Sequence, residues 1–204
     1  MFLEKFKNLN MVSLVIDASS LNVQVGILKE KQWISFSENN IPALESIFTS
    51  VRHCLYETNL ELKDINRLMY CEGPGSTLGI RLSSMACQTW ARLSNTTIIT
   101  FSFNNLYAIA KIIKEEYKDI KYPIAIVSES IENRWHCLMI LKEDDFSEKI
   151  KELTITEIEK LNIPLFAPPP KKSTFSLEHK RIHYSLKPYP FILEELITPN
   201  ENFN

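Results

Sequence analysis

The chain has 204 residues, and its content of 45% hydrophobic and 24% charged residues is typical of a folded globular protein rather than a disordered one. Its 23 basic and 25 acidic side chains give a net charge of −2, which excludes a protein that grips a nucleic-acid backbone through a global basic excess. Contact with a nucleic acid would therefore need a partner or a local basic patch.

The chain contains four widely spaced cysteines, Cys54, Cys71, Cys87 and Cys137. None belongs to a CxxC pair, which excludes a compact zinc site or disulfide scaffold and favours reduced, buried thiols. The apolar run after Met11 is too short for a signal peptide or a membrane span, so we expect a cytoplasmic protein without membrane contact. We expect residues 1–11 to be an N-terminal extension, with Met11 as an alternative start because a strand is predicted from Val12.

Three strands are predicted first. Residues 12–16 form an apolar run typical of a strand buried on both faces, and residues 21–28 and 32–36 follow as further strands. A polar turn at 17–20 and a charged hairpin at 29–31 separate them. This order predicts an antiparallel meander.

Helices and strands then alternate. Apolar residues at helical spacing predict a helix that begins at Pro42, and two further helices over 76–94 and 106–117. Strands are predicted over 65–71 and 96–101. Because each of these strands is followed by a helix, we expect crossover connections and parallel strands.

The pattern restarts in the second half of the chain. Residues 124–127 and 134–141 are predicted to form neighbouring strands. Thr156 and Glu159 have the spacing of a capping box ahead of a short helix. A further short helix is predicted over 190–197.

Glycine is concentrated at one junction. The chain has only four glycines, and three of them lie in residues 73–79, between a predicted strand and a predicted helix. Glycine permits a positive φ angle and close approach of two backbones, so this junction is a tightly specified turn. Its spacing matches neither a P-loop nor GxGxxG, and no lysine follows it, which excludes a Walker nucleotide site.

The helix predicted over 76–94 has two distinct faces. One face carries larger side chains that could fill a core: Leu82, Met85, Ala86, Thr89, Trp90 and Leu93. The other carries small side chains: Ser83 or Ser84, Cys87, Ala91 and Ser94. Small side chains let another helix approach closely. The sequence leaves open whether the first helix of this chain or a second polypeptide covers that face.

Three segments match, in order and spacing, the motifs of one known family. Residues 73–83, GPGSTLGIRLS, are similar to the signature GPGSFTGLRIG, and residues 15–20, VIDASS, resemble an opening strand followed by an AIDTS turn. Residues 101–106, FSFNNL, resemble a GVSSLEALA segment. These are motifs of the bacterial TsaB family, also called YeaZ. The resemblance covers residues 12–113 and is that of a divergent member.

The resemblance implies the fold class. TsaB proteins have an actin-like ASKHA fold of the ribonuclease H-like α/β class, in which helices flank a mixed sheet. On this basis we expect a first subdomain over 12–118 and a shortened, divergent second subdomain over 119–204.

The resemblance also implies a function, that of a non-catalytic scaffold or activator in threonylcarbamoyladenosine biosynthesis. Such proteins pair with the TsaD transferase, which modifies adenosine 37 of tRNA, and the ATPase TsaE joins the pair. We therefore expect a TsaD-like partner, a TsaE-like ATPase, indirect contact with tRNA, a homodimer when the partner is absent, and no cofactor or metal. The family's partner contacts on the first two helices correspond to Leu44, Ile47, Phe48, Val51, Ser84, Cys87, Gln88 and Ala91.

Two other functions remain open. An actin-like ATPase or phosphotransferase acting alone could use Asp17, which resembles the magnesium-binding carboxylate of such enzymes. Its anion contacts would be Gly73, Gly75 and Ser76 at the start of a helix. However, Ser76 is more typical of a helix N-cap than of a nucleophile because the GxSxG pattern is absent. The second alternative is a regulatory homodimer.

Two features near the C-terminus also need an interpretation. His179 and His183 have HxxxH spacing, which would suit a metal on a helix, but the basic residues between them disfavour a cation. They belong to a basic, partly aromatic cluster: Lys171, Lys172, Phe175, His179, Lys180, Arg181, His183, Tyr184 and Lys187. This cluster is either a contact for an RNA backbone or a solvated loop.

Overall fold

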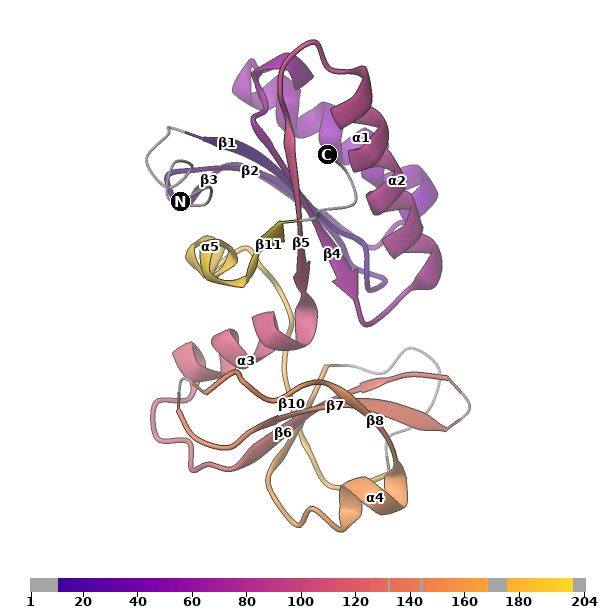
Figure 1. The fold of residues 1–204 in the computed structure, drawn as a ribbon, viewed down its shortest axis with the longest axis vertical. Helices are drawn as coiled ribbons and strands as arrows, with labels where there is room; N and C mark the ends of the chain where they lie inside the picture. The colour runs from indigo at the N-terminus through magenta and orange to yellow at the C-terminus, as the bar shows by residue number, and fades with distance from the viewer. Residues whose placement is uncertain (1–10, 132, 144, 169–175, 200–204) are drawn as a thin grey trace.

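The computed structural model describes residues 11–131, 133–143, 145–168 and 176–199, which form two β-sheets with associated helices (Figure 1). The first sheet contains β1 (Val12–Asp17), β2 (Val23–Lys29), β3 (Gln32–Asn39), β4 (Arg67–Gly73), β5 (Ile99–Asn104) and β11 (Thr198–Pro199). The second contains β6 (Ile124–Glu129), β7 (Arg134–Ile140), β8 (Lys151–Thr154), β9 (Leu165–Ala167) and β10 (Lys180–Arg181). The helices are α1 (Ala43–Thr58), α2 (Thr77–Leu93), α3 (Asn105–Glu116), α4 (Ile155–Glu159) and α5 (Leu193–Leu196), with short 3₁₀ helices at Leu62–Asp64 and Pro190–Ile192.

The first sheet is mixed, with the strand order β11-β5-β4-β1-β2-β3. β1, β2 and β3 pair antiparallel, so the predicted meander is confirmed. β4 pairs parallel with both β1 and β5. The chain reaches these parallel positions through α1 and α2, as expected for strands connected by crossover helices.

Both faces of the first sheet are covered. On β1, Leu14 and Ile16 lie in a core formed with α1 and α2, whereas Val15 lies in a second core that includes α3. Successive side chains of a strand point to opposite faces, which explains why a strand covered on both faces is mostly apolar. Figure 1 shows α1 and α2 together on one side of this sheet and α3 between the two sheets.

The second sheet has the order β10-β9-β6-β7-β8 and is also mixed. Ile158 of α4 packs against Trp135 and Cys137 on one face, and α3 packs against β6 and β7 on the other. Cys137 is buried while its neighbour His136 is half-buried, because the two side chains alternate across β7.

Several predicted boundaries need correction: β4 lies at Arg67–Gly73 instead of 65–71, and β3 extends to Asn39 instead of residue 36. β5 begins at Ile99, later than expected, because Ser94 and Thr96 are hydrogen-bonded to each other in the preceding turn. The capping box lies at Thr154 and Glu157 rather than at Thr156 and Glu159. Strand β8 ends at Thr154, so the helix that follows begins two residues earlier than the spacing suggested.

The C-terminal residues do not stay with the second sheet. After β10 the chain returns to the first sheet, where β11 pairs antiparallel with β5. Arg67 of β4 binds Glu194 of α5 through both guanidinium amino groups, and its Nε donates to Ser13 Oγ at 2.8 Å. Within residues 119–204, expected to form the second subdomain, α5 and β11 thus contact the first sheet.

The predicted mixed α/β class is confirmed by the two mixed sheets and their helices. In the part of the chain that the structure describes, no helix combines the length and the apolar character needed to cross a membrane. Most of the expected N-terminal extension lies outside the described residues, and Met11, directly before β1, is buried.

Candidate functional site between the two sheets

The glycine-rich turn after β4 packs directly against the turn after β1. A Cβ atom on Gly75 would lie 2.0 Å from the backbone oxygen of Ser19, and one on Gly79 would lie 1.9 Å from the backbone oxygen of Ala18. The Ser76 N–H donates to the same Ser19 oxygen at 2.7 Å. These glycines are therefore needed for contact between two backbones of this chain.

The residues predicted as anion contacts have roles in the local fold. Gly73 has a φ angle of +105°, which residues with a side chain rarely adopt. The Oγ of Ser76 accepts a hydrogen bond from the Gly79 N–H at 3.3 Å, so the predicted N-cap of α2 is confirmed. The backbone amide of Ser76, which an anion would use, already donates to Ser19.

Asp17, the predicted magnesium carboxylate, is fully buried and bonded on both oxygens. Its Oδ1 accepts from the backbone N–H of Ser19 at 2.8 Å and from the Ser19 hydroxyl at 2.6 Å. Its Oδ2 accepts from the hydroxyl of Tyr184 at 2.6 Å. The carboxylate is therefore held by groups of the chain itself.

Tyr184 is the residue of this site that the sequence did not reveal, since it was assigned to a basic surface cluster. It is instead buried, beside Asp17 and Cys71. Burial raises the pKa of Tyr184 well above its ordinary value, and the negative charge of Asp17 raises it further. Burial likewise raises the pKa of the Cys71 thiol. Both groups are thus kept neutral, as expected close to a buried carboxylate.

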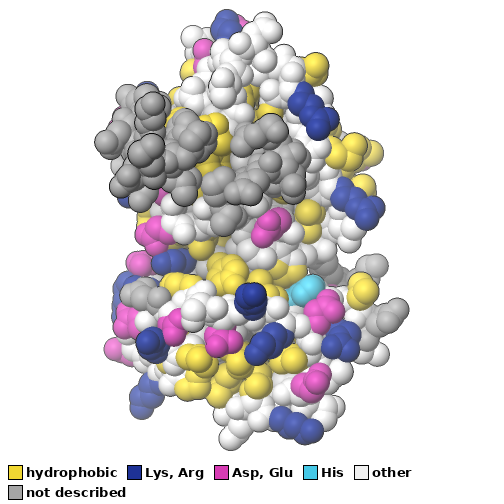
Figure 2. Space-filling model, in the orientation of Figure 1, with side chains coloured by type: hydrophobic (Ala, Val, Ile, Leu, Met, Phe, Trp, Pro, Cys, Tyr) yellow, Lys and Arg dark blue, Asp and Glu magenta, His cyan; other side chains and the backbone are white. Residues whose placement is uncertain are grey.

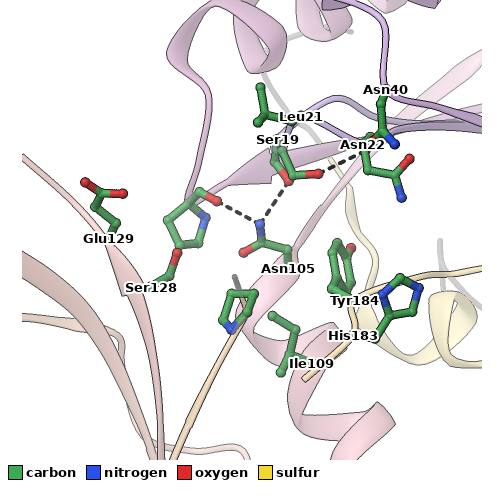
Figure 3. A pocket seen from close by; sticks show the side chains of 13 residues that line it. Ser19, Leu21, Asn22, Asn40, Asn105, Ile109, Ser128, Glu129, His183 and Tyr184 are labelled. Atoms are coloured by element: carbon green, nitrogen blue, oxygen red, sulfur yellow. Dashed lines mark hydrogen bonds between the residues drawn. The ribbon is translucent and has the colours of Figure 1, made fainter. Parts of the chain in front are cut away.

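A cavity of about 290 Å³ lies between the two sheets, next to these groups (Figure 3). Ser19 and Pro74 line it from the first sheet, and Ser128 lines it from the end of β6. Ile109 of α3 and Tyr184 contribute apolar surface. The carboxyl ends of several strands meet here, where α/β proteins commonly bind small molecules.

Asn105, the first residue of α3, forms hydrogen bonds with two other residues that line this cavity. Its Nδ2 donates to Ser19 Oγ at 2.9 Å and to the backbone oxygen of Pro74 at 2.7 Å. Its Oδ1 is buried and accepts no hydrogen bond in the structure. Because Pro74 offers only an acceptor, the amide nitrogen must face it, and Oδ1 must point the other way.

The small-residue face of α2 is covered by this chain itself. The buried residues of α2 are Gly79, Ser83, Ala86 and Cys87. Cys87 lies in the same core as Ile47 and Val51 of α1. Ile47, Val51 and Cys87, which were predicted as partner contacts, are thus buried within the chain itself.

The other predicted contact residues lie at the surface or at its edge. Leu44 is 61% exposed and Phe48 is 47% exposed, although Phe48 also packs edge-on against Trp90 of α2. Ser84, Gln88 and Ala91 are half-buried, and Gln88 Nε2 donates to Ser84 Oγ at 3.1 Å.

Of the larger face of α2, predicted to fill the core, Ala86 is buried and Leu82 and Trp90 pack against the core, whereas Met85 and Leu93 are exposed. Leu78 and Met85 are each 62% exposed, and Leu93 is 76% exposed. The fully buried residues of α2 are all small, which lets the helix lie close to the sheet and to α1. We call the exposed apolar residues Leu44, Phe48, Leu78, Met85 and Leu93 the helix-pair residues.

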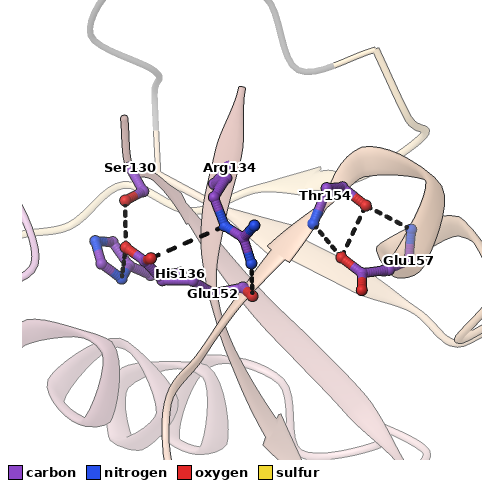
Figure 4. Close-up of polar contacts among 6 residues, drawn as sticks. All are labelled: Ser130, Arg134, His136, Glu152, Thr154 and Glu157. Atoms are coloured by element: carbon purple, nitrogen blue, oxygen red, sulfur yellow. Dashed lines mark hydrogen bonds and ion pairs between the residues drawn. The ribbon is translucent and has the colours of Figure 1, made fainter. Parts of the chain in front are cut away.

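A polar cluster joins β7 and β8 at the edge of the second sheet (Figure 4). Glu152 accepts from the Ser130 hydroxyl at 2.7 Å, lies 3.8 Å from His136 Nδ1, and pairs with Arg134 at 3.9 Å. Partial burial lowers the pKa of His136, and the hydrogen bond from Ser130 lowers the pKa of Glu152. These polar contacts link the neighbouring strands β7 and β8. They give the residues of the cluster a structural role.

The described part of the C-terminal basic cluster includes β10 and the residues on either side of it. Lys171, Lys172 and Phe175 lie outside the described residues. His179 and His183 flank the extended strand β10, where residues at HxxxH spacing lie about 13 Å apart along the chain instead of on adjacent turns of a helix. Lys180 lies over the ring of Tyr117, 3.7 Å from its centre. Among the described side chains on the face drawn in Figure 2, Lys and Arg are interspersed with Asp and Glu.

Comparison with known proteins identifies structural but not sequence relatives. No family model matches the sequence, and no curated protein matches it. YeaZ from Pseudomonas aeruginosa is 18% identical, with a TM-score of 0.62 over 78% of this chain and 75% of that chain. A second Pseudomonas aeruginosa structure, described as an uncharacterized protein with similarity to peptidase YEAZ, has the same identity and coverage and a TM-score of 0.61. The chain therefore has a YeaZ-like fold, consistent with the predicted ASKHA-type architecture.

Proposed function

We propose that this chain is a TsaB-like, non-catalytic subunit that pairs with a TsaD-like transferase in the threonylcarbamoylation of tRNA. The proposal rests on the resemblance of residues 12–113 to TsaB motifs, supported by the YeaZ-like fold. Contact with tRNA would then be made by the transferase, in keeping with the net charge of −2.

The observation that carries the proposal is the exposure of large apolar side chains on α1 and α2. Leu44, Phe48, Leu78, Met85 and Leu93 are each at least 47% exposed. Large apolar side chains gathered on neighbouring elements are typical of protein–protein contacts. The contact we propose is made by these helix-pair residues and replaces the one predicted at the buried Ile47, Val51 and Cys87.

The hydrogen bonds of Asp17 and Ser76, the residues that could contact a nucleotide, support a non-catalytic subunit. A magnesium ion at Asp17 would need carboxylate oxygens that now accept hydrogen bonds from Ser19 and Tyr184. A phosphate at the start of α2 would need the Ser76 amide, which donates to the backbone of Ser19. An ATPase acting alone would have to break these contacts.

The proposal is tested by measuring the affinity of the full chain for the TsaD-like protein of the same organism by calorimetry. We expect saturable binding that Leu44→Asp and Met85→Asp each weaken by about tenfold or more, because a charge would be buried at the contact. Ile131→Asp provides the matched control, since Ile131 is 70% exposed and lies in the β6–β7 turn.

Three outcomes would contradict the proposal. These are no binding when both proteins are folded, an equal effect of Ile131→Asp, and saturable binding of magnesium-ATP by the isolated chain. Sedimentation of the same variants measures their oligomeric state and so tests the remaining alternative, a regulatory homodimer. A homodimer that Met85→Asp dissociates, without any binding to the TsaD-like protein, would favour the regulatory homodimer.

A further inference from the structure

We propose that the cavity between the two sheets is a binding site for a small, uncharged, largely apolar molecule that carries one N–H or O–H donor. None of its described lining residues belongs to α1 or α2, so this site is separate from the helix-pair residues. The inference therefore does not depend on the proposed partner.

The hydrogen-bonding group of the site is Asn105 Oδ1. Asn105 is 7% exposed, and its Nδ2 is fully used by Ser19 and Pro74, while Oδ1 accepts no hydrogen bond. Figure 3 shows the amide oxygen of Asn105 pointing to the side of the cavity on which Ser128 lies. A buried carbonyl oxygen without a donor is unfavourable, so a ligand that donates to it gains binding energy.

The orientation of this amide is held by two bonds that a ligand need not disturb. Ser19 Oγ already donates to Asp17, so it can only accept from Asn105 Nδ2. Since Asp17 Oδ2 is in turn bonded to Tyr184, the acceptor belongs to a chain of ordered groups. Such preorganisation reduces the cost of binding.

The walls of the cavity determine the charge and polarity of the ligand. Pro74, Ile109 and Leu21 provide apolar surface. Among the described residues that line it there is no lysine or arginine, and Glu129 contributes a carboxylate. A phosphate or carboxylate group would lose its hydration without gaining a lysine or arginine among the described lining residues, so an anionic nucleotide is disfavoured. The cavity instead suits an uncharged body with a single donor.

Indole and indene test the inference as a matched pair, since they have the same shape and only indole has an N–H donor. NMR titration of the full chain should give saturable shifts at residues around Asn105 with indole, and about fivefold weaker binding with indene. Asn105→Leu should remove this preference. Ser128→Phe, which fills the cavity, should abolish binding of both compounds, whereas Ser147→Phe on an exposed loop should leave it unchanged.

Other results would overturn the inference. These are no saturable binding of indole, equal affinity for indole and indene, or an unchanged preference in Asn105→Leu. Binding of magnesium-ATP that Ser128→Phe removes would assign the cavity to an anionic ligand instead. Thermal unfolding of each variant, compared with Ser147→Phe, distinguishes loss of the site from loss of the fold.

Discussion

Asp17 and Tyr184 are 167 positions apart in the sequence, yet their side chains share a hydrogen bond of 2.6 Å in the interior. A buried carboxylate is costly unless polar groups stabilise it, and here one tyrosine and one serine do so. The same residue that resembles a magnesium ligand in the sequence therefore connects the C-terminal segment to the first sheet.

Replacing Tyr184 by Phe should lower the free energy of unfolding by about 1–3 kcal/mol, because Asp17 Oδ2 loses its donor in a buried position. The contribution of Tyr184 to stability also depends on pH. Its pKa is raised in the folded state, so this contribution is present below about pH 10 and is lost as the pH rises further. Urea unfolding at several pH values should show a shallower alkaline loss in the variant.

Tyr56 offers a control for this measurement. It lies on α1 and is 82% exposed, so Tyr56→Phe should change the free energy of unfolding by less than about 0.5 kcal/mol. A Tyr184→Phe variant as stable as Tyr56→Phe would show that the bond to Asp17 has no net stabilising effect.

At the scale of elements, α2 is positioned by its smallest side chains. Gly79 approaches the Ala18 backbone, and Ser83, Ala86 and Cys87 complete the buried face. The larger side chains at Leu78 and Met85 consequently face outward. The hydrophobic pattern of a helix does not by itself identify its buried face when close packing requires small residues.

Replacing Cys87 by Asp should lower the free energy of unfolding by more than about 3 kcal/mol, because the side chain is fully buried in an apolar core. Burial raises the pKa of the Cys87 thiol to about 12, which indicates how strongly this position disfavours charge. Met85→Asp, two residues away and exposed, should cost less than about 1 kcal/mol. Similar urea midpoints for the two variants would contradict the assignment of the faces.

At the scale of the whole molecule, the two sheets are joined by α3 and by the returning C-terminal segment. The core that contains Val15 of β1 also contains Ile126 of β6 and Leu193 of α5, so the sheets share one apolar interior. Arg67 adds a polar contact between β4 and α5, since its guanidinium pairs with Glu194. The candidate cavity lies where these units meet.

Replacing Glu194 by Ala should lower the free energy of unfolding by about 2 kcal/mol, because Arg67 is 8% exposed and would lose its carboxylate. Glu195 is an adjacent control. Its side chain is 59% exposed and pairs with Lys111, so Glu195→Ala should cost less than about 0.5 kcal/mol. Equal decreases in the unfolding temperature of the two variants would show that the ion pair between Arg67 and Glu194 does not hold the returning segment.

Much of the first half of the fold could be predicted because its signals are local. The apolar run of β1, the spacing of apolar residues in α1 and the glycines after β4 are each visible as a pattern within a short stretch of sequence, although the contacts of Gly75 and Gly79 are with the distant turn after β1. The Ser76 cap was predicted for the same reason. In the second half, the register of the capping box was missed by two residues because pairing of β8 decided where the helix begins.

The amino-acid sequence alone therefore determined the order of most elements, the tight turn at Gly73–Gly79 and the resemblance to TsaB motifs. Tertiary structure decided which face of α2 is buried, the position of Tyr184 against Asp17, and the unsatisfied Oδ1 of Asn105. Local propensity depends on neighbours in the chain, whereas burial and hydrogen-bond satisfaction depend on segments brought together from distant positions. Only the packed molecule brings those segments into contact.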